Sequence, residues 1–321
     1  MVVGAGGVLA ALCGDVIAVR TGLGRFFFGT VLLAAGTSLP ELISAFTSAS
    51  LGEPNLAAGN LLGSCLVDIF FLAVLDLFTR RTRLLRQIAI THTLTASLGA
   101  LMVATVGFFI LVPLGWQVGP LDMEGLVVVA FFLGGLQAIR LRARVSAFER
   151  QAEEEATPRF SLPMAIIGFA GAAALLVLVT PTLVNSASEI AIETGLGAGF
   201  IGMTLLATTT NIPDLVSSVS AVRIGAYDLA VGNLFGTTVF DMFVMGLISL
   251  AFPGSLFSGI SPGFVAVGLL LLVLTNVALF GTLANLEWRI LRVEWDAALI
   301  ILIYLAGNYL LYRLGLLLPA R

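Results

Sequence analysis

Apolar segments long enough to cross a lipid bilayer follow one another along almost the whole chain. A membrane helix needs roughly 20 apolar residues, and the 321 residues divide into ten such segments. Only 11% of the residues are charged, whereas a soluble domain carries roughly 25%. We therefore predict an all-α membrane protein with about ten transmembrane helices. The predicted spans cover residues 2–20, 23–50, 56–79, 88–112, 119–141, 161–194, 197–223, 228–252, 259–284 and 295–317.

The chain repeats itself when its sequence is shifted by 173 residues. Between 36–71 and 209–244, 13 of 36 positions are identical, and the similarity extends over 21–72 and 194–245. Each half carries five spans, and because five is odd the second half enters the membrane from the opposite side. Inverted repeats with interrupted helices are the architecture of secondary transporters. We predict a first five-helix repeat over 1–141, a cytoplasmic linker over 142–160 and a second repeat over 161–321.

The arginines predict how the helices are oriented. All 16 basic residues are arginine, and 14 of them lie in or beside the loops after spans 1, 3, 5, 7 and 9; the exceptions are Arg313 and Arg321. Cytoplasmic loops carry an excess of basic residues. We therefore expect both termini outside, in a plasma membrane that the short loops and the arginine-only composition suggest is a prokaryotic inner membrane.

Two spans contain a proline followed directly by an acid. These pairs are Pro40-Glu41 and Pro213-Asp214, and they align in the repeat. Proline has no N–H, so the carbonyls of Gly36 and Thr209 lose their helical partners. Free carbonyls at membrane depth occur only where they are buried in protein or line a cavity. The pairs therefore predict interrupted helices at a polar site.

Helical spacing places further polar residues on the faces that carry these acids. Their donors are all hard oxygens, which suit Na⁺, Ca²⁺ or Mg²⁺ and not zinc or copper. Four carboxylates from four helices could thus converge on one cation site. The candidate residues are Thr37, Ser38 and Glu41 on span 2, Asn60, Ser64 and Asp68 on span 3, Thr210, Asn211 and Asp214 on span 7, and Asn233, Thr237 and Asp241 on span 8.

The cost of burying these acids argues for bound cations. One acid at the centre of a bilayer costs roughly 2.5–3.5 kcal/mol, so four would cost on the order of 10–14 kcal/mol. No basic residue lies near the middle of these spans. Cations or protons must therefore neutralise the acids, and a purely structural role for them is disfavoured.

The motifs resemble those of the cation/calcium exchanger superfamily, specifically its sodium/calcium exchanger branch. GTSLPELISA at 36–45 and GNLLGSCLVDIF at 59–70 resemble its first α-repeat, and TNIPDLVSS at 210–218 and GNLFGTTVFDMF at 232–243 resemble its second. The resemblance implies an antiporter, not an enzyme, in which helices 2, 3, 7 and 8 hold the ions and helices 1 and 6 slide past them. No cofactor is implied beyond the transported Ca²⁺ and Na⁺.

The resemblance also implies roles for individual residues. Glu41 and Asp214 match the central calcium ligands, and Thr37 and Thr210 contribute further oxygens. Ala34 and Ala207 match positions whose carbonyls contact sodium. The rest of the ring corresponds to Ser64, Asp68, Thr237 and Asp241.

Other couplings and other classes of protein remain open at this point. The Pro-Asp and Phe-Asp pairs of the second repeat resemble the potassium-dependent branch, and four acids would leave a net charge of −2 around one Ca²⁺, which favours an added proton or monovalent ion. The alternatives are a Ca²⁺/H⁺, K⁺-dependent or other divalent cation exchanger and, less favoured, a passive cation channel or an intramembrane aspartyl protease. We expect inorganic cations and the lipid bilayer as partners, with no nucleic acid and no obligatory protein partner.

The two cysteines, Cys13 and Cys65, lie inside apolar spans without the spacing of a metal site. Buried free cysteine usually behaves as a small hydrophobic residue. We interpret both as packing residues.

Overall fold

A computed structural model describes residues 2–78, 84–119, 121–150, 161–194, 198–252, 254–284, 289–290 and 293–315. The part of the predicted linker from 151 to 160 lies outside these ranges. The described chain is almost entirely helical, as the apolar segments predict.

The first half of the chain forms single long helices on either side of one segmented unit. That unit contains a short π-helix, η1, between its α-helical pieces. The elements are α1 (Val2–Arg20), α2 (Gly24–Phe27), η1 (Phe28–Leu33), α3 (Ala34–Thr37), α4 (Leu39–Ser50), α5 (Pro54–Phe78), α6 (Leu84–Leu111) and α7 (Met123–Arg150).

The second half has the same order of long and segmented helices. Its segmented unit again contains a π-helix, η2, followed by two α-helical pieces. The elements are α8 (Leu162–Thr194), α9 (Ala198–Ile201), η2 (Gly202–Leu206), α10 (Ala207–Thr210), α11 (Ile212–Arg223), α12 (Tyr227–Leu247), the 3-10 helix η3 (Ile248–Leu250), α13 (Leu256–Gly259), α14 (Gly263–Ala284) and α15 (Trp295–Arg313).

The predicted spans correspond in order to these helices and segmented units. Among the described residues, seven helices are long and apolar enough to cross a membrane, and eight if the bent pair Gly24–Thr37 and Leu39–Ser50 is one span. The two predicted spans outside this count are α1 and the unit from α9 to α11. Asn211 divides the latter into pieces too short to span by themselves.

Two short hairpins and a longer α7 differ from the prediction. Strand β1 (Gln117–Val118) pairs with β2 (Leu121–Asp122), and β3 (Arg289–Ile290) pairs with β4 (Val293–Glu294), both antiparallel. Helix α7 continues to Arg150, so the first part of the predicted linker is helical. Long helices often extend past the bilayer, and hydrophobicity alone therefore does not predict where they end.

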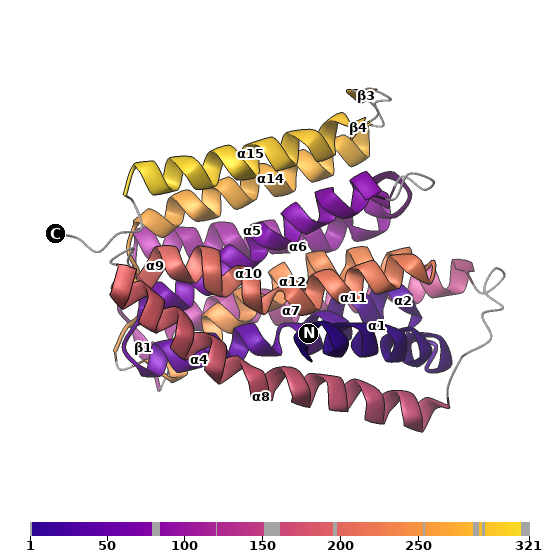
Figure 1. Ribbon diagram of the computed structural model, residues 1–321, viewed down its shortest axis with the longest axis horizontal. Coiled ribbons are helices and arrows are strands. Elements are labelled where there is room, and N and C mark those ends of the chain that lie inside the picture. The colour runs from indigo at the N-terminus through magenta and orange to yellow at the C-terminus, as the bar shows by residue number, and fades with distance from the viewer. Residues whose placement is uncertain are drawn as a thin grey trace.

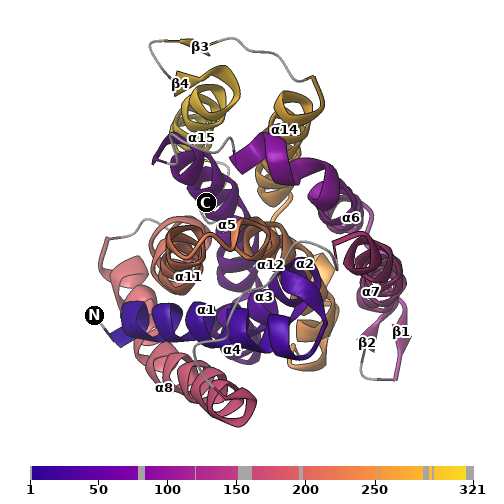
Figure 2. The same cartoon turned by 90° about the vertical axis from the view of Figure 1, so that its right-hand side faces the viewer.

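The helices run broadly side by side (Figure 1), with α5 and α12 near the middle when the molecule is viewed from one end (Figure 2). Helix α12 packs against α5, α6, α7 and η1, and α14 packs against α5, α6 and α15. On the opposite side, α1 packs against α8 and α11. The central pair of helices is therefore enclosed by the others.

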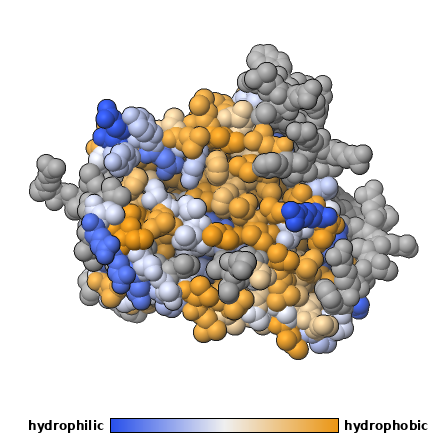
Figure 3. Space-filling view, in the orientation of Figure 1, coloured by the Kyte–Doolittle hydropathy of each residue, from blue (hydrophilic) through white to orange (hydrophobic). Residues whose placement is uncertain are grey.

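The outer surface is apolar, as expected for a protein surrounded by lipid. Apolar side chains cover much of the middle of the face in Figure 3. Large apolar residues such as Ile167 and Leu178 on α8, and Leu302 on α15, are more than half exposed. In a bilayer these side chains contact lipid instead of water, which removes the cost of exposing them.

Candidate cation site

Each segmented unit is interrupted at one residue that stands two positions before its proline. Ser38 separates α3 from α4 and Asn211 separates α10 from α11, with backbone φ and ψ near −85° and 10°, and −81° and 0°. The two pieces of the first unit meet at a bend of 44°. Pro40 and Pro213 lie in the first turns of α4 and α11, where a helix needs no N–H from them.

These interruptions place Glu41 and Asp214 at the amino-terminal ends of α4 and α11. Both carboxylates are therefore at the end of a helix where N–H groups lack helical partners and the helix dipole favours negative charge. The predicted interruptions are present, and they position the two acids as first-turn residues.

Glycines allow the central helices to approach the segmented units closely. A Cβ atom placed on Gly63 of α5 would lie 2.5 Å from the carbonyl oxygen of Met203 in η2, and one on Gly236 of α12 would overlap the carbonyl oxygen of Thr30 in η1. Each central helix thus packs against the segmented unit of the other half of the chain. This exchange brings residues from both repeats to one place.

All 14 predicted site residues are buried, none with more than 1% of its surface exposed. The four acids Glu41, Asp68, Asp214 and Asp241, called here the acidic cluster, lie close enough to repel one another electrostatically. In the described part of the chain, Arg25 pairs with Asp15 at 2.6 Å and His92 Nε2 lies 3.4 Å from Asp228 Oδ1, and neither contact involves these acids.

Hydroxyl and amide groups bind two of the four carboxylates. Thr37 Oγ1 donates to Asp214 Oδ1 at 2.6 Å, and Asn233 Nδ2 donates to the same oxygen at 3.0 Å. Thr237 Oγ1 donates to Asp68 Oδ2 at 2.5 Å. The bonds of Thr37 and Thr237 connect residues 177 and 169 positions apart, so the site is formed jointly by the two repeats.

Five carboxylate oxygens of the cluster have no hydrogen-bond partner. They are Glu41 Oε1, Glu41 Oε2, Asp68 Oδ1, Asp214 Oδ2 and Asp241 Oδ1. An unsatisfied buried charge is costly. These oxygens are therefore positioned to take up cations or protons.

Uncharged oxygens must contribute to any cation site here. Among the described residues, no three Cys, His, Asp or Glu side chains converge tightly enough to hold one metal ion. The hydroxyls of Ser38 and Ser64 are buried without a hydrogen-bond partner and could supply such oxygens.

The predicted carbonyl ligands already accept hydrogen bonds. Ala34 O accepts from the N–H of Ser38 at 2.9 Å; Thr37 Oγ1 lies 3.3 Å away, but its single proton is donated to Asp214. Ala207 O accepts from the N–H of Asn211 at 3.1 Å; Thr210 Oγ1 lies 3.3 Å away, but its proton is donated to Leu206 O at 3.0 Å. A carbonyl oxygen has two lone pairs, so each of these carbonyls keeps one for contact with sodium.

The remaining predicted residues support the site from outside the acidic cluster. Thr210 Oγ1 lies 3.4 Å from Asn60 Oδ1, and Asn60 Nδ2 donates to Ser44 Oγ at 2.5 Å. Asn211 Nδ2 donates to the backbone oxygen of Ser64 at 2.8 Å. These contacts hold the central helix α5 in position against α4 and against the interruption at Asn211.

Some residues that contact the site were not predicted, among them Ser44, Ser217 and Cys65. Ser44 and its repeat counterpart Ser217 hydrogen-bond with Asn60 and Asn233, and both stand three residues after an acid. Cys65, interpreted as a packing residue, instead donates its S–H to Asp241 Oδ2 at 3.7 Å. The repeat would have revealed the serines, but no sequence signal pointed to the cysteine.

Comparison with known proteins identifies the family. The model of the sodium/calcium exchanger protein family matches residues 2–137 and 164–314. An uncharacterized membrane protein of Methanocaldococcus jannaschii is 24% identical over 290 residues, which are 90% of this chain and 87% of that protein. Inner membrane protein YrbG of Escherichia coli is 27% identical over 240 residues, 73% of this chain and 72% of that protein.

The fold matches a solved exchanger. The structure of the sodium-calcium exchanger NCX_Mj soaked with 10 mM Na⁺ and zero Ca²⁺ aligns with a TM-score of 0.65 at 18% identity, over 96% of this chain and 94% of that one. The fold predicted from the motifs is therefore confirmed. The family match, which covers most of the chain, makes it a membrane transporter and not an enzyme. It belongs to the sodium/calcium exchanger protein family.

Proposed function

We propose that the chain is a secondary antiporter that exchanges Ca²⁺ for Na⁺ by alternating access. The observation that carries the proposal is the set of five carboxylate oxygens that are buried without hydrogen-bond partners. Carboxylate, hydroxyl and amide oxygens are the ligands that Ca²⁺ prefers. The acidic cluster is the site of competition, because Ca²⁺ and Na⁺ would bind the same oxygens.

Each predicted residue has a role in this proposal. Glu41 supplies two oxygens and is the main calcium ligand, with Asp214 opposite it. Asp68 and Asp241 complete the ring and, with Thr37, Ser38, Ser64 and Thr237, hold the sodium ions. Thr210, Asn211, Asn60 and Asn233 orient these ligands, and the carbonyls of Ala34 and Ala207 each offer a second lone pair to sodium.

The charge of the acidic cluster favours a second candidate, in which Ca²⁺ transport is coupled to a proton or to K⁺. Four ionised carboxylates carry −4, and one Ca²⁺ neutralises half of this charge. A proton or K⁺ bound beside Ca²⁺ would neutralise more, and the unpartnered Oδ1 of Asp68 is a position for it. Ca²⁺/H⁺ or K⁺-dependent exchange is therefore the second candidate.

Flux measurements separate these candidates. The purified chain is reconstituted in vesicles, and calcium uptake is followed under sodium, potassium and proton gradients imposed one at a time. Sodium-driven flux that saturates supports the first proposal. Flux driven only by a pH gradient would move the assignment to Ca²⁺/H⁺ exchange, and flux without any counter-ion would indicate a channel.

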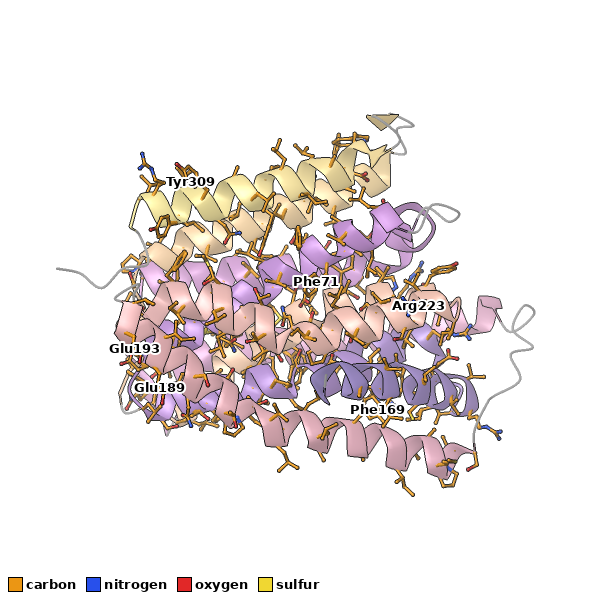
Figure 4. The ribbon with its side chains drawn as sticks, viewed as in Figure 1. Phe71, Phe169, Glu189, Glu193, Arg223 and Tyr309 are labelled. Carbon is orange, nitrogen blue, oxygen red and sulfur yellow. The ribbon has the colours of Figure 1, made fainter. Side chains whose placement is uncertain are left out.

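We also propose that the two halves are inverted repeats with both termini outside, in an inner membrane. Glu189 and Glu193 of α8 are exposed at the end of the molecule opposite Arg223 (Figure 4), which agrees with a cytoplasmic arginine-rich end. The relative in Escherichia coli is named an inner membrane protein. Labelling of single cysteines introduced at Glu193 and Arg223 from outside intact cells tests the orientation, and only the first should react.

A further inference from the structure

A thiol lies at one edge of the acidic cluster. Cys65 of α5 has no exposed surface, and its Sγ donates to Asp241 Oδ2 of α12 at 3.7 Å. The other oxygen of this carboxylate, Oδ1, is equally buried and has no hydrogen-bond partner. A thiol is a weak donor, so this carboxylate is poorly satisfied by the protein alone.

Two further donors surround this pair. The hydroxyl of Ser38 lies near the Asp241 carboxylate, and the hydroxyl of Thr238 lies near the Cys65 thiol. Both hydroxyl oxygens are buried without a well-formed hydrogen bond. One thiol, one carboxylate and two hydroxyl groups, from α5, α12 and the Ser38 interruption, thus lie close together.

The matching position in the other half of the cluster has no sulfur. The 173-residue shift aligns Cys65 with Thr238 and Asp241 with Asp68. Asp68 is held by the hydroxyl of Thr237 at 2.5 Å. The Asp68 side therefore offers oxygen alone, and the Asp241 side offers oxygen and sulfur.

This difference has a chemical consequence. Thiolate sulfur selects soft or borderline divalent cations over Ca²⁺ and Mg²⁺. We propose that Cys65 and Asp241, with Ser38 and Thr238, form a binding position for thiophilic divalent cations such as Cd²⁺. When such a cation binds, the S–H bond breaks, a metal–sulfur bond forms and the proton passes to water, with no change in oxidation state.

The position overlaps the proposed Ca²⁺/Na⁺ site, and to that extent the inference rests on the proposed function. A cation held by Asp241 would compete with Ca²⁺ for the cluster. The protein would then be blocked by thiophilic divalent cations, or would transport them, at concentrations where an all-oxygen site would still prefer Ca²⁺.

Direct binding of Cd²⁺ tests the proposal without requiring transport. The purified chain is titrated with Cd²⁺, and the ultraviolet charge-transfer absorption of a cadmium–thiolate bond is recorded. The chain has two cysteines, so Cys13→Ser is the matched control: Cys13 lies on α1 beside Gly168, in a separate apolar cluster. We expect the absorption in the wild type and in Cys13→Ser, and none in Cys65→Ser.

Competition and a second variant complete the test. Excess Ca²⁺ should reduce the absorption, and Cys65→Ser should weaken Cd²⁺ binding at least about tenfold relative to its own Ca²⁺ affinity. Cys65→Ala, checked for a monodisperse folded state, should behave in the same way. A wild type without the absorption, equal Cd²⁺ affinity in Cys65→Ser, or absorption insensitive to Ca²⁺ would each overturn the proposal.

The two proposals fail differently. Cadmium–thiolate absorption that Ca²⁺ displaces, in a protein that shows no sodium-driven calcium flux, would contradict Na⁺ coupling and leave the thiophilic position intact. Sodium-driven calcium flux without the absorption would support Na⁺ coupling and contradict the thiophilic position.

Discussion

Glu41 and Asp214 occupy matching positions in the two repeats, but their carboxylates have different surroundings. Asp214 accepts hydrogen bonds from Thr37, which reaches across from the other repeat, and from Asn233. The counterpart of Thr37 is Thr210, which lies near Glu41 but donates its proton to Leu206 O at 3.0 Å, so both oxygens of Glu41 lack hydrogen-bond partners. One acid is held in place by the protein, and the other is available to a cation.

The difference follows from small changes on a shared framework. Glu41 has one more methylene group than Asp214, so its carboxylate lies farther from its own backbone than that of Asp214 does. The interruptions also differ, because Asn211 donates to the backbone of Ser64 whereas the hydroxyl of its counterpart, Ser38, has no hydrogen-bond partner. Two repeats with the same order of helices can therefore differ in the hydrogen bonds that hold their acids.

The largest effect is expected for Glu41→Gln. The change removes a ligand charge and keeps the shape of the side chain, and loss of a direct ligand should exceed the roughly 10–100-fold loss typical of residues that only support a ligand. Calcium flux in vesicles should therefore be abolished. Glu189→Gln, at an exposed acid of α8, should transport normally, and wild-type flux in Glu41→Gln would refute the site.

The pair Thr37→Val and Thr210→Val tests the unequal hydrogen bonding directly. Thr37→Val removes the 2.6 Å bond to Asp214 and should weaken Ca²⁺ binding by roughly 10–100-fold. Thr210→Val removes a 3.0 Å bond to the backbone oxygen of Leu206 and a 3.4 Å contact with Asn60, and should cost less than about tenfold. Calorimetric Ca²⁺ titrations measure both, and equal losses would mean that the two halves work alike.

The glycines at the close helix contacts should, in contrast, be equally important for stability in the two halves. Gly63→Ala and Gly236→Ala each force a methyl group against a backbone carbonyl, and overpacking of this kind costs roughly 1–3 kcal/mol. Thermal unfolding in detergent should show similar destabilisation for both. Gly107→Ala, where a Cβ atom meets nothing within 4 Å, is the control and should not be destabilised.

The mildest change is expected for Asp68→Asn. The amide oxygen can still accept from Thr237, so Ca²⁺ transport should persist within about tenfold of wild type. The cluster would lose one charge, however, and its dependence on pH, Na⁺ or K⁺ should change. Flux under separate gradients measures this, and an unaltered ion dependence would exclude Asp68 from the coupling.

The sequence predicted the helical framework, and the candidate site residues that it named are buried, but it did not predict the hydrogen bonds among them. Spacing of four along the central helices was enough to place Asn60, Ser64 and Asp68 on one face, and all are buried together. The π-helical turns η1 and η2 were not foreseen, since a π-turn depends on the fit to neighbouring helices more than on local sequence. Thr37 meeting Asp214, and Cys65 meeting Asp241, depend on distances between helices that no periodicity encodes.

The packing of α1 and α8 brings one helix pair into contact with both interruptions. A Cβ atom on Gly7 of α1 would lie 2.8 Å from the carbonyl oxygen of Pro213, and one on Gly36 would lie 2.6 Å from the ring of Phe169 on α8 (Figure 4). Since α1 and α8 also pack against each other, a displacement of the pair would disturb the surroundings of Glu41 and Asp214 in the same event. A cation held between those two acids, as proposed above, would thus be mechanically linked to the position of helices that contribute no ligand to it.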